Sequence, residues 1–169
     1  MKTLIFFIFV SFVGFTQSIN TLLFKKINNY RVENNLNPLV LSEEAKLLNS
    51  QQLDYMVETS TVPLDHTQKL KTSYPKTFNT FNDRVNYVYN YDFVYLGENL
   101  YGGVYEGTPE QVAETIFKAW VNSPSHNKLM LNPLPSGMYV NYQITHRMIV
   151  DGVTYMCCDI IYCVLTIYK

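Results

Sequence analysis

The sequence predicts an α+β fold in which helices cover a mainly antiparallel sheet. Apolar residues recur at helical spacing in the first part of the chain, but the pattern changes after Pro135. Residues 138–148 and 153–167 are rich in Tyr, Val, Ile and Thr, and Asp151-Gly152 between them is a strong hairpin signal. Residues 92–101 supply one more extended segment. This order of helices first and a hairpin last is typical of a sheet covered by helices.

Apolar spacing predicts the first three helices. The first spans residues 20–34. Ser42 is a good N-cap, followed by two glutamates in the first turn, and it begins a second helix that ends near Glu58. The third helix covers residues 79–89.

The fourth helix has the best start signal in the chain. Thr108-Pro109-Glu110-Gln111 combines an N-cap, a proline at the first helical position and the glutamine of a capping box. Trp120 closes its apolar stripe, and we expect Ser123 and Pro124 to end the helix.

The first 18 residues predict a secretory signal peptide. Lys2 gives a positive start, residues 4–15 are an apolar run, and Thr16-Gln17-Ser18 offers small residues at a cleavage site. The run is about a dozen residues, short of the roughly 20 that span a bilayer. An uncleaved membrane anchor is the alternative. We therefore expect a secreted protein with one domain over residues 19–169 and no membrane span once the signal is removed.

Charge and cysteine usage exclude some partners. The formal net charge is −1 and no basic run is present, which argues against nucleic acid as a partner.

Cys157, Cys158 and Cys163 lie close together and cannot form the spread disulfide framework of small secreted folds. We expect them to be small buried apolar residues, with an intermolecular disulfide as the alternative. No CxxC spacing indicates zinc.

Three side chains are candidates for one polar site. Glu98 lies on the extended segment, whereas His66 and His126 lie in loops that border the second and fourth helices. If the helices pack on the sheet, these side chains converge on one cleft. Two imidazoles and a carboxylate have the chemistry of a divalent-metal site, such as zinc with water as a fourth ligand. Ordinary hydrogen bonding of each histidine is the alternative.

Three further residues are expected to be structural. We expect Arg31 to be the buried ion-pair partner of an acid, Asn99 to tie the strand end to a neighbouring loop, and Trp120 to lie in the core.

Five motifs, taken in chain order, resemble one family. They are Asn28-Asn29-Tyr30-Arg31 with Pro38-Leu39, the second helix followed by His66, Gly97-Glu98-Asn99-Leu100, Trp120-x-x-Ser123-Pro124-x-His126-x-x-x-Met130-Leu131, and Gly137. The family is the CAP superfamily, shared by cysteine-rich secretory proteins, antigen 5 and plant pathogenesis-related 1 proteins. The chain is most similar to its smaller, bacterial-type branch.

The resemblance implies a three-layer α-β-α sandwich with a central cleft, lined in many members by two His and two Glu. His66 and Glu98 correspond to the first His and the first Glu. Ser123 stands where the second Glu falls in eukaryotic members, and His126 follows the bacterial-type pattern. The segment that carries the second His in eukaryotic members is absent, because residues 155–159 contain no His.

The resemblance implies a secreted, non-catalytic module that binds a lipid, a sterol or a partner protein at a cleft containing His66, Glu98, Ser123 and His126. The alternative is a hydrolase or a metal-dependent protease in which Glu98 acts with His66 or His126. Ser123 near His126 also suggests a Ser-His pair, but no acid or oxyanion site accompanies it.

Overall fold

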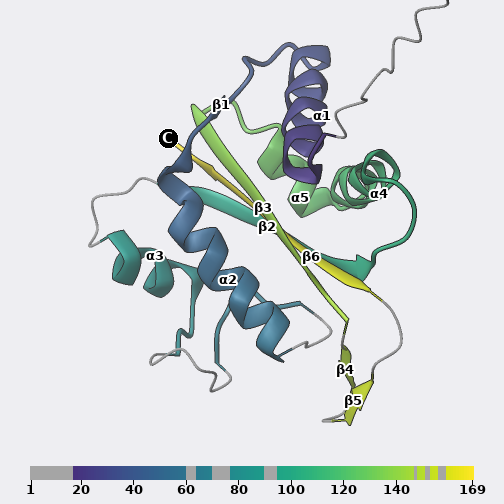
Figure 1. Ribbon diagram of the computed structural model, residues 1–169. Coiled ribbons are helices and arrows are strands. Elements are labelled where there is room, and N and C mark those ends of the chain that lie inside the picture. Colours follow the sequence, from purple (N-terminus) through teal and green to yellow (C-terminus); the bar gives the residue numbers. More distant parts are fainter. Residues whose placement is uncertain are drawn as a thin grey trace, which may run out of the picture.

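The structure is a computed structural model in which the sheet lies between two layers of helices (Figure 1). It describes residues 17–59, 64–69, 77–89, 95–146, 148–150, 153–155 and 159–169. Almost all of the predicted signal peptide therefore lies outside the described residues. No helix within these ranges is long and apolar enough to cross a membrane.

The main sheet has four strands in the order β1-β3-β6-β2. Their bounds are β1 Val40–Leu41, β2 Tyr95–Val104, β3 Gly137–Thr145 and β6 Ile160–Tyr168. β6 pairs antiparallel with both β2 and β3, whereas β1 pairs parallel with β3. The sheet is therefore mixed, and its parallel edge strand was not predicted.

Helices cover both faces of this sheet (Figure 1). One layer holds α1 (Ile19–Glu33), α4 (Pro109–Asn122) and α5 (Pro124–Met130). The other holds α2 (Lys46–Thr59) and α3 (Phe81–Tyr89). The predicted three-layer α-β-α sandwich is confirmed.

The central strand β6 joins the two cores, and all nine of its residues are buried. Side chains alternate between the faces of a strand. Ile161, Cys163, Leu165 and Ile167 accordingly pack in the cluster that includes α1 and α4, while Ile160, Tyr162 and Val164 pack against α2. Cys163 is a free, buried thiol whose pKa is raised by burial, as expected for a small apolar residue. Cys157 and Cys158 lie outside the described residues.

The capping box of α4 is confirmed at both of its hydrogen bonds. The Gln111 backbone N donates to Thr108 Oγ1 (3.3 Å), and the Thr108 backbone N donates to Gln111 Oε1 (2.8 Å). The hydroxyl of Ser42 also accepts from the Glu44 backbone N (3.3 Å). That first turn is a 3₁₀ helix, η1 (Glu43–Ala45), so α2 proper begins at Lys46.

Pro124 ends α4 as predicted, since that helix runs to Asn122, but it is also the first residue of a further helix, α5, where a missing N–H costs nothing. Two other predicted boundaries were wrong. β2 runs past the predicted end at residue 101, since Gly102 and Gly103 also pair with β6. Each of the two long C-terminal strands is divided, and β4 (Met148–Val150) pairs with β5 (Val153–Tyr155) in a separate ribbon. The predicted Asp151-Gly152 turn lies outside the described residues.

Candidate functional site

The site is centred on Glu98, near the start of the edge strand β2. Glu98 lies opposite Thr166 of β6. Because side chains alternate along a strand, Glu98 and Leu100 share one face, and Leu100 packs against α2. The Glu98 side chain is only 1 % exposed. A carboxylate so deeply buried needs a charged or hydrogen-bonding partner.

That partner is Arg84 of α3, which the sequence analysis missed. Arg84 Nη2 lies 2.6 Å from Glu98 Oε1, and the Arg84 side chain is completely buried. The guanidinium carbon also lies 4.6 Å from the centroid of the Phe81 ring, a cation–π contact. A signal was present, because Arg84 follows the apolar Phe81 by three residues and precedes the apolar Val88 by four, which places all three on one face of the helix.

Amide side chains hold Arg84 from its other side. Arg84 Nη1 donates to Gln52 Oε1 of α2, and Gln68 Nε2 donates to the same oxygen (3.0 Å). Gln52 Nε2 in turn donates to the backbone carbonyl of Asp65 (3.0 Å). The network thus joins α2, α3, β2 and the segment that carries His66.

His66 is the exposed end of this network. Its Nδ1 lies 2.9 Å from Glu98 Oε1, and its side chain is 45 % exposed. Because Glu98 Oε1 accepts from Arg84 Nη2, we assign His66 Nδ1 as the donor of this hydrogen bond. The predicted convergence of His66 and Glu98 is therefore present.

His126 lies in α5 and not in a loop, which corrects the sequence prediction. Burial lowers the pKa of the His126 imidazole, and the charge of nearby His66 lowers it further. The backbone carbonyl of His126 accepts from Asn99 Nδ2 (3.1 Å). Asn99 ties β2 to its neighbour as predicted, although that neighbour is a helix.

Ser123 does not form the suggested Ser-His pair. It is the residue between α4 and α5, and its hydroxyl lies 3.3 Å from the hydroxyl of Ser125. The partner of this hydroxyl is another hydroxyl, which is too weak a base to activate a serine.

The three predicted metal ligands are not gathered as a metal site. Within the described ranges, no group of three or more His, Cys, Asp and Glu side chains is arranged to hold a metal ion. The physical reason lies at Glu98, which is almost fully buried and already has the Arg84 guanidinium beside it, so a second cation at either carboxylate oxygen would lie close to a fixed positive charge. These residues do not fit a zinc ion.

Two atoms of the ion pair keep unused hydrogen-bonding capacity. In the described part of the chain, neither Glu98 Oε2 nor Arg84 Nε has a hydrogen-bond partner, and both are buried. The pair is thus joined through one carboxylate oxygen, and not through the two parallel bonds of a bidentate fork.

Trp120 and Arg31 are both buried, as predicted. Trp120 lies in the core, and its Nε1 donates to the Leu100 carbonyl (3.1 Å). Arg31 is buried as predicted, but the predicted acid partner was wrong: it donates to the carbonyls of Met130 (2.6 Å), Asn132 (2.8 Å) and Asn37 (2.9 Å). Burial lowers the pKa of Arg31. The last carbonyls of a helix lack intrahelical donors, so the end of α5 attracts this cation without an acid.

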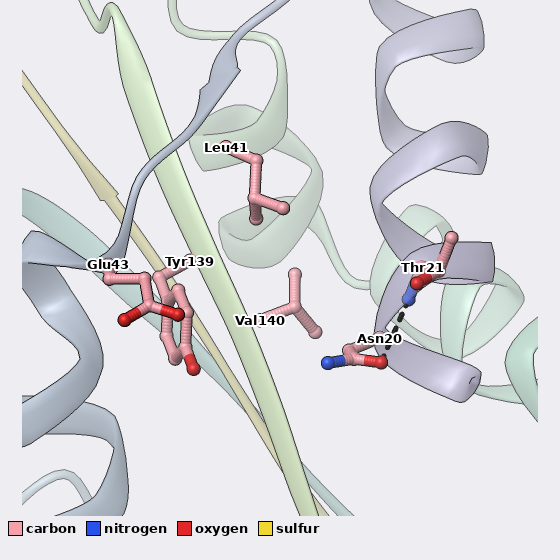
Figure 2. A pocket seen from close by; sticks show the side chains of 6 residues that line it. All are labelled: Asn20, Thr21, Leu41, Glu43, Tyr139 and Val140. Carbon is pink, nitrogen blue, oxygen red and sulfur yellow. Dashed lines mark hydrogen bonds between the residues drawn. The ribbon is translucent and has the colours of Figure 1, made fainter.

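A small groove lies at the opposite edge of the sheet, beside β1 and β3 (Figure 2). Its volume is about 120 Å³. It is lined by Asn20, Thr21, Leu41, Glu43, Tyr139 and Val140. None of the predicted site residues lines it.

Comparisons with known proteins agree with this architecture. The sequence profile of CAP, the cysteine-rich secretory protein family, matches residues 24–138. The chain therefore belongs to the CAP family. No curated protein matches the chain.

Several solved structures share the fold. An outer surface protein of Borrelia burgdorferi is 18 % identical with a TM-score of 0.54, and the match covers 89 % of this chain and 93 % of that one. A cysteine-rich secretory protein of Staphylococcus aureus is 15 % identical with a TM-score of 0.53, covering 93 % of this chain and 41 % of that one. An extracellular protein of Bacillus anthracis that contains an SCP domain is 19 % identical with a TM-score of 0.52, covering 89 % and 40 %. The last two chains are much longer than this one.

Proposed function

We propose that the protein is a secreted, non-catalytic binding module that contacts a partner protein through the surface around His66 and His126, here called the His66–His126 face. The observation that carries the proposal is the burial of the acid. Glu98, at 1 % exposure, lies behind His66, at 45 % exposure, so a bound molecule meets the imidazole and not the carboxylate. A half-exposed imidazole on a fixed backbone suits recognition.

The same observation weakens the hydrolase alternative. A general base must come within about 2.6–3.2 Å of the proton that it removes. Glu98 Oε1 already accepts from Arg84 and His66, and it has no exposed surface for a substrate to reach. Ser123, the one nucleophile of the predicted site, is paired with Ser125.

The choice of a protein over a lipid or sterol rests on the position of His66. Its side chain is 45 % exposed, so the imidazole is open to the surface of a partner from outside the fold. Sites for small molecules are usually cavities of about 300–1,000 Å³. The groove of Figure 2, at about 120 Å³, is smaller than that and lies away from the site, so it is not proposed as the binding site.

Secretion is supported by two observations. The N-terminal residues have the pattern of a signal peptide. Two of the proteins with the same fold are described as an outer surface protein and an extracellular protein.

An affinity-capture experiment tests this function. The immobilised protein is used to capture partner proteins from the culture medium and the cell-surface extract of the source organism. Immobilised wild-type protein is compared with the double variant His66→Gln/His126→Gln and with His146→Gln as a matched control, since the His146 side chain is 76 % exposed on another part of the chain. We expect one partner that the wild type and the control retain and the double variant loses.

Two parallel assays address the alternatives. If a fluorescent sterol or fatty acid binds, and this binding depends on His66 and His126, then the ligand of this face is a lipid and not a protein. Hydrolysis of peptide or ester substrates that Glu98→Gln abolishes would refute the non-catalytic proposal.

A further inference from the structure

The candidate site contains a cation that neither the family resemblance nor the comparisons assign. Arg84 is completely buried and lies 2.6 Å from Glu98, the most buried carboxylate of the site. Leaving a buried carboxylate without a compensating charge is strongly unfavourable. In this structure the chain itself supplies that charge.

The guanidinium is held in place by more than its carboxylate. Gln52 accepts from Arg84 Nη1, Phe81 packs under the guanidinium carbon, and Gln68 donates to Gln52 from the far side. These contacts come from three different segments of the chain. Arg84 is therefore positioned independently of any ligand.

This arrangement conflicts with a metal at the same carboxylate. Zinc binds a carboxylate oxygen at about 2.0–2.2 Å and an imidazole nitrogen at about 2.0–2.1 Å. Glu98 Oε1 has a guanidinium nitrogen at 2.6 Å and His66 Nδ1 at 2.9 Å. A dication at that oxygen, or at the unpartnered Oε2 of the same carboxylate, would lie close to a fixed positive charge, and at Oε1 it would also displace the hydrogen bond between His66 and Glu98.

We propose that Arg84 is the resident cation of this site: it takes the place of a metal ion at Glu98 and positions His66 through that carboxylate. The site is consequently metal-independent, and removing the guanidinium converts Glu98 and His66 into a weak zinc site. This inference does not depend on whether the His66–His126 face binds a partner protein.

Isothermal titration with zinc at neutral pH tests the proposal on the full chain. The wild type should give the same isotherm as Glu98→Gln, because zinc does not reach the carboxylate. Arg84→Met should gain zinc affinity by about tenfold or more, the size of effect that residues around a metal site commonly have. Adding Glu98→Gln to Arg84→Met should abolish the gain.

Arg31→Met is the matched control. Arg31 is also a buried arginine, but it contacts carbonyl oxygens and no carboxylate, so its removal should bring no zinc affinity. Zinc binding by the wild type that Glu98→Gln abolishes would overturn the proposal. So would an Arg84→Met variant that folds and binds no more zinc than the wild type. The wild-type arm needs no variant of Arg84, so the proposal stays falsifiable even if Arg84→Met does not fold.

Discussion

Replacing Arg31 by methionine measures how strongly one buried cation joins α1 to the end of α5. Three hydrogen bonds are lost, one from Nε to the Asn37 carbonyl and two from Nη1 to the carbonyls of Met130 and Asn132. Methionine keeps much of the apolar volume, so the change removes mainly the donors. The variant should still fold, with a lower free energy of unfolding.

The size of the loss follows from burial. Hydrogen bonds from a charged group contribute about 1.5–3 kcal/mol each, and a buried carbonyl left without a donor costs about 1–3 kcal/mol. Only the bond to Met130 is fully buried, while the carbonyls of Asn37 and Asn132 can be hydrated in part. We therefore expect Arg31→Met to lower the free energy of unfolding by about 3 kcal/mol.

Urea unfolding, followed by the fluorescence of the single tryptophan Trp120, gives this quantity directly. The midpoint should fall while the slope with urea concentration stays the same. Val32→Ala is the matched control, because Val32 is the next residue of α1 and is 57 % exposed, and it should change stability by less than about 0.5 kcal/mol. If Arg31→Met were no less stable than this control, the carbonyls would not need the guanidinium and the reasoning would be wrong.

Three other changes give separate checks. Trp120→Phe leaves the buried Leu100 carbonyl without its donor and opens a small cavity, so calorimetry should show a loss of about 2–4 kcal/mol. Thr108→Ala removes the capping box with Gln111 and should cost about 1 kcal/mol by urea unfolding, whereas Thr108→Ser should cost little. The pKa of His126 is lowered in the folded state, so the unfolded state binds more protons as the pH falls below about 6.5. The free energy of unfolding should therefore decrease as the pH is lowered below about 6.5, and it should decrease less steeply in His126→Gln than in the wild type. Equal pH dependence of the two proteins would contradict a lowered pKa for His126.

Elements with local signals could be predicted from the sequence. The α4 start at Thr108 depends on residues within one turn, and its cap formed as expected. β1 has no such signal. Val40 and Leu41 become a strand only because the Val40 backbone N donates to the Ser136 carbonyl (2.8 Å), far along the chain. The start of α5 was missed because a proline can both end one helix and occupy the first turn of the next, and Pro124 does both.

The candidate site was predictable in part for the same reason. The contact between His66 and Glu98 agreed with the expected convergence, because the second helix and the strand place both residues at one edge of the sheet. Their chemistry depends on a third residue from α3. No pattern within the Gly97-Glu98-Asn99-Leu100 motif indicates which cation will face its acid.

A buried acid beside a histidine indicates a metal only if the chain supplies no positive charge of its own. Arg84 lies on the inward face of α3, and an arginine on such a face needs a carboxylate or several carbonyl groups as partners. Arg31 donates to carbonyl groups at the end of a helix. Arg84 instead contacts Glu98, because Gln52 and Phe81 hold its guanidinium there. The two buried arginines thus have different partners for different local reasons, and the chemistry beside Glu98 depends on the residue at position 84 as well as on the histidines.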